Sequence, residues 1–315
     1  MGRTEARILL VVITLFASVQ YAFIEMIGDE DYSPFGFTCI TNLIGLGMVL
    51  VMFGGMIFGE FYRYTKKDIL NSLLLAVELT GFNVFMYIGS SSETATVSGG
   101  ILSAYFVFVP IIMFVFRLSK PKPHIIVASL IAVVGVFIVV GIDMTGTLRP
   151  ETLALVVADI CFALYTVTVG RISTNSSPTF IAAGQLFWCS VMTGILWIGE
   201  VVLTDRSFSI STNPMFIVSV GFMGVFLKGL YTVAQIHAQR IISPIETSFI
   251  FSTEILMTMF LSPLLALLLP IEKETITPIR LLGGVLVIIG IMVADDNTYS
   301  KLSKKFRRVD GGKKT

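Results

Sequence analysis

Ten apolar runs, separated by short polar segments, dominate the chain. A bilayer core about 30 Å thick needs roughly 20 apolar residues per helix, which matches the length of these runs. The pattern therefore predicts an all-α membrane protein of ten transmembrane helices. The expected spans are residues 7–28, 34–59, 68–90, 94–117, 124–143, 150–170, 179–203, 213–238, 245–269 and 278–295.

The first run, 7–28, follows basic residues, as the apolar part of a signal peptide would. Its apolar part is too long for a signal peptide, and a polar Gly28-Asp29-Glu30-Asp31 segment follows where a small-residue cleavage site would be expected. We therefore interpret it as the first membrane span.

Composition supports this prediction. Of 315 residues, 55% are hydrophobic and 14% are charged, well below the quarter or so that is charged in soluble domains. The net charge of +1 gives no sign of a nucleic-acid partner. Cys39, Cys161 and Cys189 have neither disulfide nor metal-site spacing, so we expect buried thiols and no cofactor.

Basic residues predict the orientation, because loops on the cytoplasmic side are enriched in Lys and Arg. The side of the N-terminus is the richer one, and the basic tail 297–315 falls on it as well. Both termini are therefore expected in the cytoplasm, with the protein in a plasma membrane or a bacterial inner membrane. Opposite them lie Arg149, Arg206, Lys273 and Arg280.

Weak internal repeats divide the chain into two halves. The segment 90–95 resembles 243–248, and at the same offset Pro110 aligns with Pro263. With a gap of two residues, Gly135 aligns with Gly290. Because each half holds an odd number of spans, the second must insert upside down, as in many transporters. We expect inverted five-helix repeats over 1–148 and 149–296.

Three groups of segments carry a family resemblance: Pro150–Asp159 with Leu164-Tyr165-Thr166, Ile242-Ser243-Pro244, and Arg280–Gly284 with Ile289-Gly290-Ile291. They resemble the drug/metabolite transporter superfamily, in particular its ten-helix EamA-type branch. The resemblance implies a transporter whose cavity is lined by spans 1, 3, 4, 6, 8 and 9.

Three positions depart from the family pattern. Asn42 stands in the region where the second helix usually carries an arginine, and Glu254 is followed by Ile255 rather than proline. Lys120 stands where a glutamate is expected after the fourth helix. These departures leave the substrate class open.

Four charged residues lie near the middle of predicted spans: Glu78, Asp159, Lys228 and Glu254. Each would cost roughly 2.5–3.5 kcal/mol if it faced lipid, so they must face the protein interior or a water-filled cavity. Lys228 could pair with Glu78 or Asp159 as a structural lock between the halves. The acids left over are either protonated or available to a cation, and Glu254 is the leading candidate.

Helical spacing places other candidates beside these charges. Tyr231 and Gln235 share a helix face with Lys228, Phe251 shares one with Glu254, and Phe162 shares one with Asp159. Gln20 in span 1 and Tyr105 in span 4 complete the candidate substrate-binding set. The aromatic rings could cage an organic cation, although packing is the commoner role of such residues.

Glu93 and Glu246 begin spans 4 and 9, where an acid favours the helix dipole. Capping is the simpler interpretation. The alternative is gating, because the inverted repeat would place the two glutamates on opposite sides of the membrane.

These features favour a secondary transporter, an exporter or exchanger of a small polar metabolite, amino acid or organic cation, driven by a proton or substrate gradient. An exchanger of phosphorylated or nucleotide-sugar substrates is the alternative, with Lys228 binding the anion. The motifs of an intramembrane enzyme are missing from the sequence, and a scaffold or receptor would not need charges inside its spans. The expected partners are a small-molecule substrate and the lipid bilayer, for a monomer or a homodimer.

Overall fold

The computed structural model describes residues 1–27, 32–90, 95–120, 122–140, 150–174, 177–204, 210–271 and 276–294. All regular elements among these residues are helices. Eight helical segments are long and apolar enough to cross a membrane, and two shorter apolar helices accompany them. The prediction of an all-α membrane protein with ten membrane helices is confirmed.

Seven spans are single helices, and their ends lie within a few residues of the predicted ones. Seven helices begin with proline, since the fixed φ of proline suits the first helical turn. Five of them are single-helix spans, and the other two are the first helices of interrupted spans. The single helices are α1 (Arg3–Met26), α2 (Pro34–Gly59), α3 (Lys66–Ser90), α6 (Pro123–Val140), α7 (Pro150–Ile172), α8 (Pro178–Thr204) and α13 (Pro278–Ala294).

Three spans are interrupted, which the sequence pattern did not predict. Span 4 consists of α4 (Ala95–Leu102), the 3₁₀ segment η2 (Ser103–Val107) and α5 (Phe108–Val115). Span 8 consists of α9 (Pro214–Phe222), the π-helical segment η3 (Met223–Leu230) and α10 (Tyr231–Ala238). Span 9 consists of α11 (Pro244–Phe251) and α12 (Glu254–Leu265). A short 3₁₀ turn, η1 (Phe61–Arg63), follows α2.

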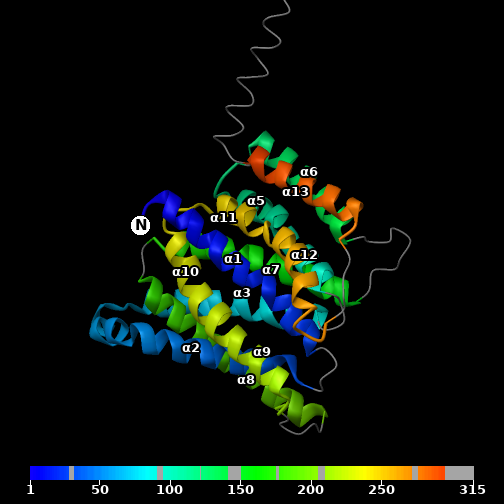
Figure 1. Ribbon diagram of the computed structural model, residues 1–315. Coiled ribbons are helices and arrows are strands. Elements are labelled where there is room, and N and C mark those ends of the chain that lie inside the picture. Colours follow the sequence, from blue (N-terminus) through cyan, green and yellow to red (C-terminus); the bar gives the residue numbers. More distant parts are fainter. Residues whose placement is uncertain are drawn as a thin grey trace, which may run out of the picture.

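The last helix of each repeat packs against its counterpart. Helices α6 and α13 lie side by side at one edge of the bundle (Figure 1). A Cβ on Gly135 would lie 2.6 Å from the carbonyl oxygen of Gly283, and one on Gly290 would lie 2.9 Å from that of Ala128. The repeat alignment pairs Gly135 with Gly290 and Ala128 with Gly283. It therefore maps one of these contacts onto the other, as two inverted halves related by a two-fold axis require.

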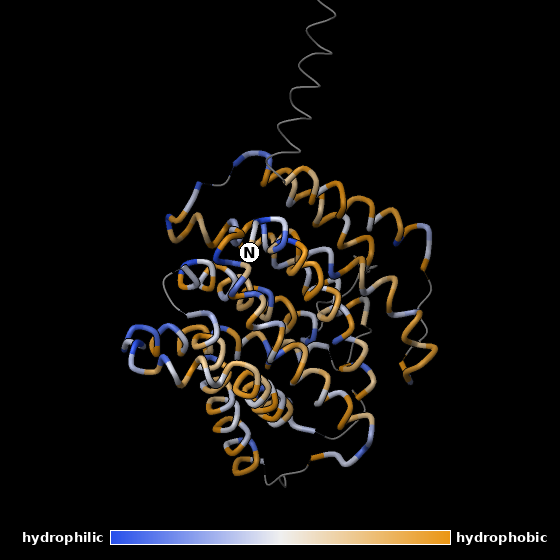
Figure 2. The backbone as a smooth tube through the Cα atoms, turned by 60° about the vertical axis from the view of Figure 1, so that its left-hand side comes forward, coloured by the Kyte–Doolittle hydropathy of each residue, from blue (hydrophilic) through white to orange (hydrophobic). Residues whose placement is uncertain are grey.

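The distribution of polarity is that of a membrane protein. Apolar side chains such as Val51 and Leu203 are 88% and 85% exposed on the outer surface, whereas Asn83 and Gln185 are fully buried. Apolar stretches cover most of the helix lengths, and hydrophilic stretches collect at helix ends (Figure 2). Lipid would cover the outer apolar surface, so the polar groups of the interior are the ones that need a functional or structural role.

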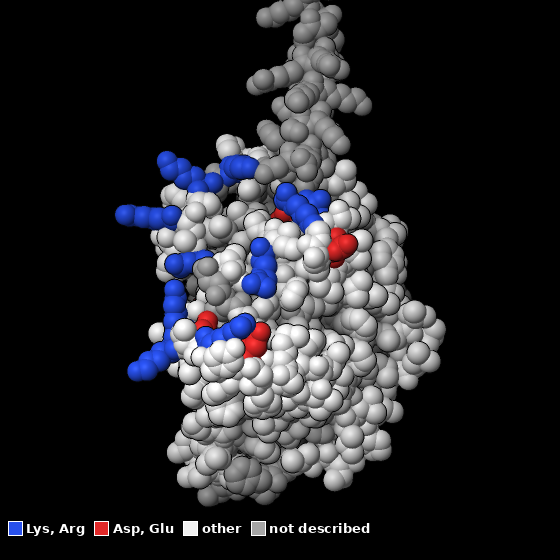
Figure 3. Space-filling view, turned by 90° about the vertical axis from the view of Figure 1, so that its left-hand side faces the viewer, with Lys and Arg blue, Asp and Glu red and all other residues white. Residues whose placement is uncertain are grey.

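Lys and Arg gather on the face of the molecule that holds the N-terminus, with few acidic side chains among them (Figure 3). We call this surface the basic face. It lies at the ends of the helices, as a membrane–water interface would. Its described basic residues are Arg3, Arg7, Arg63, Lys66, Lys67, Arg117, Lys120, Lys122, Arg171 and Arg240.

Candidate functional site

The three interrupted spans each contribute a side chain to one central cavity. Tyr105 comes from η2, Lys228 from η3, and Glu254 from the first residue of α12, directly after the break in span 9. Broken helices near the middle of the membrane free backbone groups and are typical of transporter binding sites. The cavity is lined by Ala17, Gln20, Tyr21, Leu79, Phe82, Asn83, Leu102, Tyr105, Phe162, Tyr165, Leu227, Lys228, Tyr231, Thr232, Gln235 and Glu254.

The cavity is small, about 40 Å³, which is room for a few water molecules. Its walls come from spans 1, 3, 4, 6, 8 and 9, the set that the family resemblance implies.

One end of the cavity is acidic. The amide nitrogen of Gln20 donates to Oε1 of Glu254 over 3.4 Å, and the Tyr21 hydroxyl interacts with the same carboxylate. Asp159 of α7 is 1% exposed and lies close enough to Glu254 to interact with it electrostatically, but it is not part of the cavity lining. Its Oδ1 has no hydrogen-bond partner among the described residues. Two carboxyl groups therefore share this end, one in the wall and one behind it.

The other charge in the wall is basic. Lys228 is 5% exposed; its Nζ donates to Oδ1 of Asn83 over 2.5 Å and lies 5.6 Å from the centre of the Tyr87 ring. Within the part of the chain that the structure describes, no carboxylate forms an ion pair with Lys228. The structural lock between Lys228 and Glu78 or Asp159, which the sequence left open, is not formed in this structure.

Helix α2 approaches Lys228 closely because residue 45 is glycine. A Cβ at Gly45 would lie 2.5 Å from the Cβ of Lys228 and 3.0 Å from the carbonyl oxygen of Gly224. On the facing side, a Cβ at Gly224 would lie 2.6 Å from the side chain of Ile44. These two glycines let α2 and η3 pack backbone to backbone, which fixes the position of Lys228.

A cluster of aromatic side chains surrounds the acidic end of the cavity. Tyr105 meets Phe162 edge to face, with 4.9 Å between ring centres, and Tyr231 packs against Phe251 at 5.5 Å. Tyr105, Phe162 and Tyr231 line the cavity, whereas Phe251 lies behind them and is 1% exposed. The structure thus brings three of the four predicted aromatic candidates, Tyr105, Phe162 and Tyr231, into the cavity wall.

Of the two remaining candidates, Gln235 lies in the cavity wall and Glu78 does not. Gln235 lines the cavity, and its amide nitrogen lies 3.4 Å from the side-chain oxygen of Gln239. Glu78 is half-buried between α3 and α7, where the Thr168 hydroxyl donates to its Oε1 over 2.8 Å. Glu78 is not part of the cavity lining, because the face of α3 that turns inward carries Leu79, Phe82 and Asn83.

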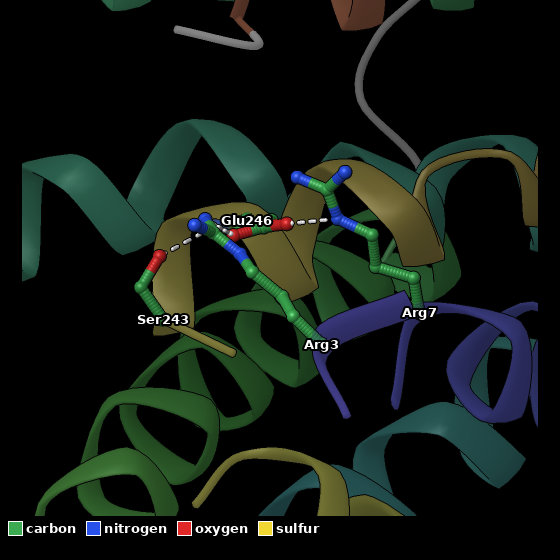
Figure 4. A network of polar contacts seen from close by, with 4 residues as sticks. All are labelled: Arg3, Arg7, Ser243 and Glu246. Atoms are coloured by element: carbon green, nitrogen blue, oxygen red, sulfur yellow. Dashed lines mark hydrogen bonds and ion pairs between the residues drawn. The ribbon is translucent and has the colours of Figure 1, made fainter. Parts of the chain in front are cut away.

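Glu246 joins the N-terminal helix to span 9 on the basic face. Its carboxylate accepts from Arg3 over 2.6 Å and from Arg7 over 2.5 Å (Figure 4). Its backbone N–H is capped by the Ser243 side chain, so the glutamate belongs to a capped first turn as well. Glu93, the second predicted gate, lies outside the described residues.

Sequence reasoning missed part of the lining. Thr232 and Tyr165 line the cavity, and each stands three or four positions from a candidate already chosen, Lys228 and Phe162 respectively. Extending those helix faces by one turn could have found them. The break in span 9 has a weaker sequence signal, which is the Ser252-Thr253 pair before Glu254. Ser and Thr side chains compete with the helix for backbone hydrogen bonds.

Paired repeats, broken helices and a polar cavity between the repeats are typical of membrane transporters. The family model for the EamA-like transporter family matches residues 5–141 and 149–294. The chain belongs to this family. Groups of His, Cys, Asp and Glu that could hold a metal ion are not found among the described residues.

Solved structures share the fold. Among 29 matching chains is a crystal structure of a protein with 13% sequence identity and a TM-score of 0.69. The match covers 95% of this chain and 98% of the other one. No curated protein matches the chain.

Proposed function

We propose that the protein is a secondary transporter of small zwitterionic or cationic metabolites, such as amino acids or organic amines. The observation that carries the proposal is that Glu254 and Lys228 line one cavity without pairing with each other. Opposite charges that are held apart by their own hydrogen bonds match a substrate with both an amine and a carboxylate.

In this proposal the substrate amine binds at the acidic end. Glu254 attracts the ammonium group, and the Tyr105 and Tyr231 rings stack against it, since aromatic faces attract cations. A substrate carboxylate binds Lys228, which Asn83 holds in place. An organic cation without a carboxylate uses the acidic end alone.

The balance of acids and bases supports proton coupling. Asp159 and Glu254 interact with each other, and Lys228, the one base among the described residues of the cavity wall, is bound to an amide. Two like charges in a buried site are costly, so one carboxyl group tends to hold a proton or to bind a cation. A proton on the Glu254–Asp159 pair that leaves when the substrate amine binds would couple the two movements.

The cavity of about 40 Å³ is too small for a metabolite, so binding requires the helices to move. We propose that the basic face is cytoplasmic and that the bridge from Arg3 and Arg7 to Glu246 closes that side between α1 and α11. The two repeats would rock about the central site, which opens one side as the other closes.

The experiment that tests this proposal is uptake into proteoliposomes from a mixed pool of amino acids and polyamines, with and without an imposed pH gradient. We expect gradient-dependent uptake by the wild type, loss of all uptake in Glu254→Gln, and loss confined to zwitterionic substrates in Lys228→Met. Uptake that the gradient does not affect would contradict proton coupling. Uptake of nothing in the pool, together with exchange of phosphorylated or nucleotide-sugar substrates that Lys228→Met abolishes, would contradict the substrate class and favour the exchanger.

A further inference from the structure

A second, larger hollow opens on the basic face, away from the central cavity. It has a volume of about 590 Å³ and lies between the start of α1, the start of α11, the segment before α6 and the end of α13. Helices α6 and α13 pack mainly against each other, so this hollow separates a peripheral helix pair from the core of the bundle (Figure 1).

The rim of the hollow is basic. Among the described lining residues, Arg3, Arg7, Lys120 and Lys122 oppose the single carboxylate of Glu246. Arg3 is 62% exposed, Lys120 and Lys122 are exposed, and the Glu246 side chain is 16% exposed. Glu246 is thus largely covered by the arginines, and the exposed charged residues of the described rim are basic. Such a rim attracts an anion such as a phosphate group.

The wall behind the rim is apolar. Val11, Ile125, Ile245, Phe249 and Ile291 line it. A free phosphate ion has no use for an apolar wall, whereas a phospholipid brings a phosphate and acyl chains together. The basic rim lies at the ends of the helices, and Val11, Ile125, Phe249 and Ile291 lie about one turn further in, which is the order of headgroup and chain in a leaflet.

The other hollow of the basic face makes a useful comparison. It has the same volume, about 590 Å³, and carries Arg63, Lys67 and Arg171. Asp68 stands among these bases, and the remaining lining includes few apolar residues beyond Leu74 and Ile172. Charge alone therefore does not distinguish the two hollows, but the combination of basic rim and apolar wall does.

We propose that the hollow between α1, α11 and the α6–α13 pair binds an anionic phospholipid, with its phosphate on Arg3, Arg7, Lys120 and Lys122. Glu246 accepts from the same two arginines, so the lipid phosphate and Glu246 compete for them. Figure 4 shows Arg3 and Arg7 reaching Glu246 from one helix, which is the arrangement that a bound phosphate would replace. The lipid would thereby loosen the contact between α1 and α11.

The test is native mass spectrometry of the purified full chain in detergent, titrated with phosphatidylglycerol and, separately, phosphatidylcholine. We expect phosphatidylglycerol to bind more tightly, and Lys120→Gln/Lys122→Gln to weaken it about tenfold or more, since each base near a membrane surface contributes roughly fivefold. The matched control, Arg63→Gln/Lys67→Gln, removes the same charge from the other hollow and should leave binding unchanged. Glu246→Gln removes the competitor and should tighten binding.

Three results would overturn the proposal. Equal binding of the two lipids would show that the negative charge of the headgroup is not recognised. Equal losses of phosphatidylglycerol binding in the two double variants would show that the whole basic face attracts the lipid, and that this hollow does not bind it specifically. Displacement of phosphatidylglycerol by inorganic phosphate at equal concentration would identify a small-anion site rather than a lipid site. Lys120 and Lys122 are exposed, and an unchanged melting temperature would show that the double variant is folded. Because lipid binding is measured without transport, this outcome is independent of the substrate proposal.

Discussion

Lys228 donates to Asn83 over 2.5 Å, so an amide rather than a carboxylate holds this base of the cavity wall. An amide satisfies the ammonium group without cancelling its charge. The positive charge therefore remains available to a substrate anion, although Glu78, Asp159 and Glu254 lie within other membrane spans. This relationship gives the first prediction.

Asn83→Leu should leave the buried ammonium group without its hydrogen bond and lower stability by about 1–3 kcal/mol. Asn83→Asp should keep the fold, but the new carboxylate should form an ion pair with Lys228. Uptake of zwitterionic substrates should therefore fall more than uptake of amines. The measurements are thermal unfolding in detergent and uptake in proteoliposomes. Equal uptake of both substrate kinds by Asn83→Asp would contradict a substrate role for Lys228.

Gly45→Ala should displace η3 and Lys228, because the new Cβ would lie 2.5 Å from the Cβ of Lys228. Overpacking of this kind costs about 1–3 kcal/mol, and we expect transport to fall with it. Gly47→Ala on the same helix is the matched control, since a Cβ there meets nothing within 4 Å. Melting temperatures and uptake of the two variants should differ, and similar values would show that this contact does not matter.

Glu78→Gln should transport nearly as well as the wild type, in contrast to Glu254→Gln. Both acids lie within spans, but Glu78 receives its hydrogen bond from Thr168 between α3 and α7, and a glutamine oxygen can accept it equally well. Uptake assays on both variants, at matched protein density, check this. Loss of transport in Glu78→Gln but not in Glu254→Gln would contradict this prediction and place the coupling role on Glu78.

Glu246→Gln should open the cavity toward the basic face more often. Ion pairs at exposed positions each contribute up to about 1 kcal/mol, so loss of two would raise the open population several-fold. A Gln20→Cys reporter in the cavity wall should then react faster with a membrane-impermeant maleimide applied from that side. Glu60→Gln is the control, because it removes an ion pair with Arg63 on the same face, away from the cavity. Equal labelling rates in both backgrounds would exclude a gating role.

Gly135→Ala and Gly290→Ala should destabilise the α6–α13 pair by similar amounts, about 1–3 kcal/mol each. Their Cβ atoms would meet opposing carbonyl oxygens at 2.6 Å and 2.9 Å in contacts that the repeat makes equivalent. Gly55→Ala, where a Cβ meets nothing within 4 Å, should be neutral. Thermal unfolding of the three variants tests the symmetry directly.

The candidate site was predictable where helical spacing and charge sufficed. A charge within a span must face inward, so Glu254 and Lys228 could be chosen from the sequence, and Tyr231 and Gln235 followed from the spacing. Glu78 obeys the same rule but turns toward α7, because burial between two helices satisfies the rule as well as a cavity does. The sequence rule excludes lipid and says nothing about which interior surface a side chain faces.

The sequence by itself determined the ten spans, their ends and the two repeats, because each depends on local hydrophobicity, on prolines at helix starts and on spacing along the chain. The tertiary structure alone decided that three helices break beside one cavity, that Lys228 binds Asn83, and that Arg3 and Arg7 reach Glu246. These features depend on how residues far apart in the chain pack together. Once every helix is buried or lipid-covered, hydrophobicity no longer distinguishes one packing partner from another, and shape and hydrogen bonding make the choice.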